Sequence, residues 1–88
     1  MAARRRQVQP RFGPERALGE ALREIRYRRD LSQEELANEC ESDRTTISLL
    51  ERGLMSPTLR MIVRLSKALS VLPSELMRRA EKSAHFRF

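Results

Sequence analysis

The sequence of 88 residues has a single cysteine, no tryptophan, one tyrosine and three phenylalanines. One cysteine cannot form a disulfide within the chain, which favours a reducing compartment. The shortage of aromatic residues leaves a core of aliphatic side chains. No apolar run approaches the about 18 residues of a membrane-spanning helix, and no apolar segment follows the N-terminal arginines as in a secretory signal. We therefore expect a cytoplasmic protein.

Groups that support catalysis or metal binding are equally scarce. The one histidine, His85, has no second histidine, cysteine pair or carboxylate cluster near it in the sequence, so no metal site is expected. Ser48 has no base or orienting residue with which to form a catalytic triad. A chain this short also has no room for a cofactor-binding α/β fold or a second domain. The sequence predicts neither an enzyme nor a cofactor.

The charge of the chain is concentrated at its two ends. There are 18 basic and 12 acidic residues, a formal charge of +6. Residues 1–14 contain four arginines and no acid, and residues 82–88 contain two basic residues and no acid. We therefore expect a flexible arginine-rich arm (1–14), a folded domain (15–81) and a tail (82–88). The arm is either a solvated segment or one that follows DNA phosphates or the minor groove.

Helical periodicity dominates the first part of the domain. Leu18, Leu22 and Ile25 follow the i, i+4, i+7 spacing of one helical face, which predicts a helix from residue 15 to about residue 30. Ser32 and Glu35 form the sequence pattern of a capping box, which predicts the start of a second helix.

Capping residues divide the rest of the domain into three further helices. Asp43 is a favourable N-cap for a third helix, and Gly53 is suited to end it. Ser56 and Pro57 predict the N-cap and first residue of a fourth helix, and Pro73 opens a fifth. The predicted apolar faces of these two helices contain Leu59, Ile62, Val63, Ser66 and Leu69, then Leu76, Met77 and Ala80. No strand-like alternation is present, so we expect a compact all-α bundle of five helices.

Residues 33–53 have the organisation of two short helices joined by a tight turn. Ala37 suits a close crossing of helices, and Cys40 is interpreted as a small core residue. Ile47 and Leu50 would hold the third helix from behind, which turns its other face outward. An α-helix fits the major groove of B-DNA, where residues near its N-terminus reach base edges.

Five segments in this order, SQEELA, DRTTIS, LERG, SPTL and KALSV, resemble the Cro/repressor-type (XRE-like) helix-turn-helix family. The resemblance covers residues 18–76, and the DRTTIS and LERG segments are similar to controller proteins of restriction–modification systems. It implies a five-helix bundle of the phage-repressor DNA-binding-domain type. The second and third helices would form the helix-turn-helix.

The resemblance also implies residue roles. Those expected to read base edges are Arg44, Thr45, Ser48 and Leu49. Those expected at phosphates are Arg26, Gln33, Thr46 and Arg52. Arg26 and Glu51 are further expected to form a structural ion pair that ties the first helix to the end of the third. For Leu49 the alternative is packing at the edge of the core, and for Arg26 it is a purely structural role.

Two positions depart from the family pattern. Glu41 and Ser70 stand where the family commonly has glycine, because a positive φ is common there. Either glutamate adopts a positive φ at a cost of about 1 kcal/mol or more, or the turn takes another shape.

These features predict a sequence-specific regulator of transcription that binds double-stranded DNA as a homodimer on a pseudo-palindromic operator. The residues expected at the dimer contact are Leu54, Met55, Leu72 and Met77. A first alternative is an antitoxin or protein-interaction module that uses the fifth helix or the tail around Phe86 and Phe88. A second alternative is a coactivator with the same fold that does not read bases.

Overall fold

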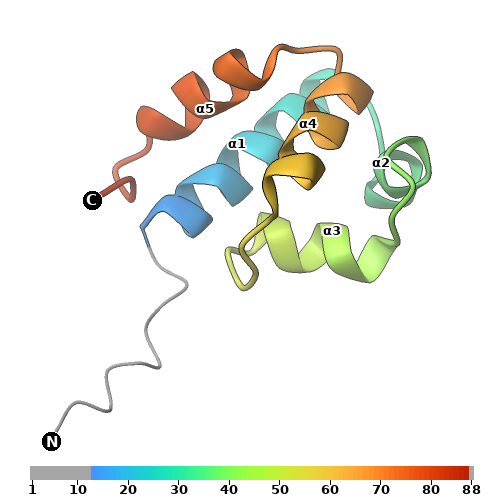
Figure 1. Cartoon of the computed structure of the whole chain (residues 1–88), viewed down its shortest axis with the longest axis horizontal. Helices are drawn as coiled ribbons and strands as arrows, with labels where there is room; N and C mark the ends of the chain where they lie inside the picture. The colour runs from blue at the N-terminus through green and yellow to red at the C-terminus, as the bar shows by residue number, and fades with distance from the viewer. Residues whose placement is uncertain (1–12, 88) are drawn as a thin grey trace, which may run out of the picture.

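Five α-helices make up most of residues 13–87, the part of the chain described by a computed structural model (Figure 1). They are α1 (Pro14–Arg28), α2 (Gln33–Glu39), α3 (Arg44–Glu51), α4 (Leu59–Ala68) and α5 (Pro73–Glu81). No strand occurs in this described range. The predicted all-α architecture is therefore confirmed. Residues 1–12 of the expected arm lie outside the described residues, and Pro14 already belongs to α1.

The helix starts follow the capping signals of the sequence. At α2 the Ser32 hydroxyl accepts from the Glu35 N–H (3.0 Å), and the Glu35 carboxylate accepts from the Ser32 N–H (2.7 Å), which completes the predicted capping box. At α3 the Asp43 carboxylate accepts from the Thr46 N–H (2.7 Å). These local bonds satisfy backbone donors that a helix end otherwise leaves without partners.

The predicted start of α4 is wrong by two residues. The helix begins at Leu59 rather than Pro57, and its N-cap is Thr58, whose hydroxyl accepts from the Met61 N–H (3.1 Å). Ser56 was a plausible cap in the sequence. The structure uses the next hydroxyl residue, and Pro57 stands outside the helix.

The helix α1 lies at the centre of the molecule, with α5 along one side and α3 along the other (Figure 1). Its buried residues, among them Leu18, Leu22 and Ile25, form one core with Leu36, Ile47, Leu50, Leu65, Leu69 and Leu76. Gly19 marks the closest crossing, since a Cβ there would fall on the backbone oxygens of Leu50 and Glu51. The absence of a side chain at Gly19 therefore lets α1 lie directly against the end of α3.

The predicted inner face of α4 is partly wrong. Leu59 and Val63, both expected in the core, are 78% and 49% exposed, whereas Leu65, Ser66 and Leu69 are buried. The apolar arc of this helix is wider than the surface that α2 and α5 cover. Periodicity identified the arc, but it did not show which part of it meets the core.

The ends of three helices contain residues other than glycine in the left-handed region. Asp30, Glu41 and Ser70 follow α1, α2 and α4 with φ of 59°, 58° and 59°. At the end of α2, the Ser42 N–H donates to the Ala37 carbonyl (2.8 Å), as in a Schellman motif. Of the two alternatives for Glu41, the turn therefore keeps the positive φ.

We predict that Glu41→Gly stabilises the protein. Glycine removes a left-handed penalty of about 1–2 kcal/mol and adds an entropic cost of roughly 0.5–1 kcal/mol. The free energy of unfolding in urea should therefore rise, by up to about 1.5 kcal/mol. The control is Glu39→Gly in the last turn of α2, where φ is helical and the same change should destabilise. Equal destabilisation by both substitutions would contradict this interpretation of the turn.

The segment after α5 folds back onto α1. Glu20 accepts a hydrogen bond from the Ser83 hydroxyl (2.7 Å) and lies 3.0 Å from Nδ1 of His85. The Phe86 side chain packs against the core. His85 thus has a carboxylate partner on α1, which the sequence spacing did not reveal.

Candidate nucleic-acid interface

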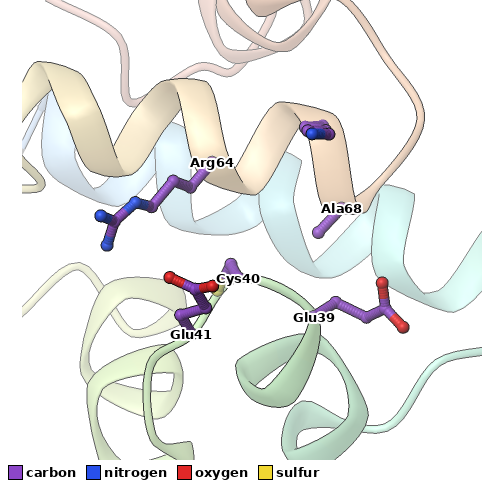
Figure 2. Close-up of a pocket in the computed structure, with 6 residues that line it drawn as sticks. Glu39, Cys40, Glu41, Arg64 and Ala68 are labelled. Carbon is purple, nitrogen blue, oxygen red and sulfur yellow. The ribbon is translucent and has the colours of Figure 1, made fainter.

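Residues 40–43 join α2 to α3 through a short turn. Cys40 caps α2, and Glu41 reverses the chain direction with its positive φ. Cys40 is buried, and burial raises the pKa of its thiol, so the thiol is protonated at neutral pH. Figure 2 shows this turn facing α4, with Glu41 on the turn and Arg64 on the helix. Both residues line a pocket of about 340 Å³. The predicted core role of Cys40 agrees with this burial.

One side of the helix α3 packs against the core, and the opposite side faces away from it. Ile47 and Leu50 are fully buried beneath it. Arg44 and Thr45 are exposed. The other two expected base readers, Ser48 and Leu49, are half-buried, and Leu49 is not part of the core cluster. All four side chains therefore lie on the half of α3 that faces away from Ile47 and Leu50.

The N-terminal end of α3 is capped by the side chain of Asp43. The hydrogen bond from the Thr46 N–H holds the pKa of the Asp43 carboxyl below its ordinary value. Asp43 is therefore ionised at neutral pH and occupies one of the backbone donors at this helix end. A phosphate contact by Thr46 would have to use its half-buried hydroxyl side chain.

Behind α3, Arg26 and Glu51 form a buried ion pair. Nε and Nη2 of Arg26 donate to the two Glu51 oxygens (2.6 and 3.0 Å), and Nη1 donates to the Leu31 carbonyl (2.8 Å). The side chains of Arg26 and Glu51 are 7% and 0% exposed. The hydrogen bond to Glu51 raises the pKa of Arg26 above its ordinary value. The guanidinium also lies 4.7 Å from the centre of the Tyr27 ring.

The same carboxylate connects three helices. Nε2 of Gln33, the first residue of α2, donates to Oε1 of Glu51 at the end of α3 (3.0 Å), and Nε of Arg23 on α1 lies 3.6 Å from that oxygen. Glu51 therefore fixes the position of α2 relative to α3. The burial of Arg26 favours a structural role over a direct phosphate contact. Arg23 was not predicted to take part in this network.

Arg52, another residue expected at a phosphate, lies at the end of α3 and is exposed. Its Nε donates to the Ser48 carbonyl (3.3 Å), which orients the guanidinium along the helix and leaves further N–H groups for an anion. Gln33 is half-buried, and its amide is partly committed to Glu51.

The described residues contain no group of three or more His, Cys, Asp or Glu able to hold a metal ion. Within the same range, no helix has the length and apolar character needed to cross a membrane.

The geometry just described matches a known family. A family model described as helix-turn-helix matches residues 22–76, which include all of α2, the turn, α3 and α4. The chain belongs to the helix-turn-helix family. This is a family of DNA-binding regulators of transcription, not of enzymes, which agrees with the sequence-based expectation.

Individual relatives of this helix-turn-helix protein include regulators of two kinds. The control protein C.BamHI of Bacillus amyloliquefaciens is 45% identical over 60 residues, which cover 67% of this chain and 74% of that protein. The restriction-modification controller protein C.AhdI from Aeromonas hydrophila has 39% identity and a TM-score of 0.68, with 69% of this chain and 92% of that chain covered. The clp gene regulator ClgR from Corynebacterium glutamicum has 27% identity and a TM-score of 0.78, covering 80% and 90%.

Proposed function

We propose that this helix-turn-helix regulator binds a specific pseudo-palindromic operator as a homodimer. The observation that carries the proposal is the outward face of α3, with Arg44 and Thr45 exposed while Ile47 and Leu50 anchor the helix from behind. A helix held in this way can enter the major groove without disturbing the core.

The four outward residues of α3 have the chemistry needed to distinguish bases. Arg44 can donate two hydrogen bonds to O6 and N7 of guanine, which is worth about 1–3 kcal/mol of discrimination. Thr45 and Ser48 can donate or accept, and the Thr45 methyl can contact a thymine methyl. Leu49 offers an apolar contact of the same kind. We assign base reading to these four residues.

Around this reading face, Gln33, Thr46 and Arg52 are the proposed phosphate contacts. Phosphate contacts set the register of a protein on the duplex without reading its sequence. Arg26 contributes to DNA binding indirectly, because its ion pair with Glu51 holds α1 against the end of α3. We therefore treat Arg26 as a positioning residue.

A second copy of the chain is the proposed partner of the outer face of α4. Leu59 and Val63 lie one turn apart on this face and are the residues that the core does not cover. Pro57 and Ile62, which are near them in the sequence, line a mostly apolar groove of about 150 Å³ together with Met77. A self-complementary apolar face suits a two-fold interface.

This surface differs in part from the dimer contact expected from the sequence. Leu54 and Leu72 are exposed as that expectation requires. Met55 and Met77 are half-buried and pack against the core, so they offer less surface to a partner. We therefore centre the proposed interface on Leu59 and Val63, which share one face of α4, and place Leu72 outside it.

The relatives suggest the genes that the protein controls. C.BamHI is named a control protein, and C.AhdI a restriction-modification controller protein. We extend this role to the present chain and propose that its operator lies at restriction–modification genes.

The antitoxin alternative has no support of this kind. Phe86, one of the aromatic residues it would present to a partner, packs against the core of its own chain. Phe88 lies outside the described residues.

Selection of bound duplexes from a random library tests the proposal. We expect enrichment of an inverted repeat whose half-sites are centred about 10 base pairs apart or a multiple of that distance. Affinity for the enriched site should fall steeply with salt as counterions are released. Enrichment of a single unrepeated half-site would contradict the homodimer, and no enrichment at all would contradict sequence-specific binding.

A further inference from the structure

A cleft of about 370 Å³ opens between the end of α1 and the side of α5. Arg28 at the end of α1 and Arg29 directly after it line the cleft from one side, and Arg79 lines it from α5. Ile25 and Val71 add an apolar part to its lining. Three guanidinium groups from two helices far apart in the sequence thus surround one opening, a feature that DNA binding by α3 does not explain.

The carboxylates near this cleft do not neutralise its arginines. A single oxygen of Glu24 forms ion pairs with two of them. It lies 2.7 Å from Nη1 of Arg79 and 3.4 Å from Nη2 of Arg28. Arg29 forms no ion pair with any residue in the described part of the chain, and its Nη2 donates instead to the neutral Ser70 carbonyl (3.1 Å). That bond holds the side chain of Arg29 at the cleft, and no carboxylate of residues 13–87 pairs with its charge.

The carboxylate that lines the cleft, Glu75, already accepts a hydrogen bond within its own helix end. Glu75 accepts from the Leu72 N–H (2.7 Å) at the start of α5, where its charge is also favoured by the helix dipole. Each guanidinium has five N–H donors in a planar fork, and each arginine of the cleft spends one of them in a known bond. With three arginines and one carboxylate in its lining, the cleft keeps a net positive charge, and most of its guanidinium N–H groups have no partner among residues 13–87.

We propose that this cleft binds a small molecule that carries a phosphoryl group. Arginine forks match the geometry of phosphoryl oxygens and bind them through paired hydrogen bonds. The volume of the cleft lies at the lower end of the about 300–1,000 Å³ typical of small-molecule sites. The half-buried Val71 and the small exposed part of Ile25 supply an apolar surface for a ring or hydrocarbon part of the same ligand.

The site is separate from the DNA-reading face. Figure 1 shows α5 and α3 on opposite sides of α1, and the cleft lies on the α5 side. Loss of this site should therefore leave operator binding unchanged, and loss of operator binding should leave this site unchanged. Failure of one proposal can thus be distinguished from failure of the other.

Titration of the full chain with adenosine 5′-monophosphate and with inorganic phosphate at constant ionic strength tests the proposal. The readout is the NMR signals of the Ile25 and Val71 methyl groups and of the Arg29 amide. We expect saturable shifts in the millimolar range with both probes and none with uncharged adenosine. Arg29→Gln should weaken binding by about tenfold, as expected for loss of one charge-assisted contact.

The matched control is Arg64→Gln, an exposed arginine on α4 outside the cleft, which should bind like the parent protein. If Arg29→Gln does not fold, Arg28→Gln carries the same expectation, since the Arg28 side chain is mostly exposed. Shifts that do not saturate, or that are equal in the parent and the cleft variants, would overturn the proposal. Displacement of the bound phosphate by short duplex DNA at these signals would also overturn it, because the site would then belong to DNA.

Discussion

Arg26→Ala is expected to lower the free energy of unfolding by about 3–5 kcal/mol, the cost of breaking a buried ion pair from one side. Glu51 would be left with its side chain fully enclosed and without its two strongest donors. Gln33 and the more distant Arg23 would remain near Glu51. A neutral amide and a half-exposed cation do not offset the cost of burying a carboxylate. Urea unfolding monitored by circular dichroism measures the loss.

Two further variants show that burial is the cause of this loss. Arg28→Ala breaks an exposed pair at 3.4 Å and should cost less than about 1 kcal/mol. Replacing Arg26 by Met together with Glu51 by Leu removes both charges, and should cost less than Arg26→Ala alone. A loss no larger for Arg26→Ala than for Arg28→Ala would contradict the structural role given to the pair.

Leu59→Glu or Val63→Glu is expected to abolish dimerisation and to weaken operator binding by about 100-fold or more, because avidity between linked half-sites is lost. The charge would fall in the centre of the proposed apolar interface, where no partner compensates it. Both residues are exposed in the monomer, so the helical content should be unchanged. Sedimentation and operator titration provide the two measurements.

Leu72→Glu is the matched control for this experiment. Leu72 is 63% exposed and apolar, but it lies at the start of α5 rather than on the outer face of α4. The variant should remain a dimer. If Leu72→Glu dissociates the protein while Leu59→Glu does not, the interface lies at the turn between α4 and α5, and our assignment to α4 is wrong.

The features that depend on neighbouring residues could be predicted from the sequence. Helix caps are formed by atoms within three residues, so the local order of residues reveals them. Examples are the capping box of Ser32 and Glu35 and the cap at Asp43. The positive φ at the end of α3 was indicated by Gly53. Ile47 and Leu50 were placed in the core because helical spacing gives each residue a side of the helix.

Features that depend on packing between helices could not be predicted in this way. Leu59 and Val63 share a helical face with buried residues, and only the position of α4 on the core shows that they are exposed. Glu20 meets the segment after α5 across more than sixty residues, and no local pattern links them. Gly19 did carry a signal, since an isolated glycine inside a helical pattern often has a packing reason.

The central claim is that the outward face of α3 reads bases. The most direct test titrates the parent protein, Arg44→Ala and Arg52→Ala against the selected operator and its single-base-pair variants. Arg44→Ala should lose about 1–3 kcal/mol of discrimination at one base pair in each half-site, whereas Arg52→Ala should weaken all sites alike and reduce the salt slope. An Arg44→Ala protein with unchanged affinity and unchanged preference at every position would contradict the claim.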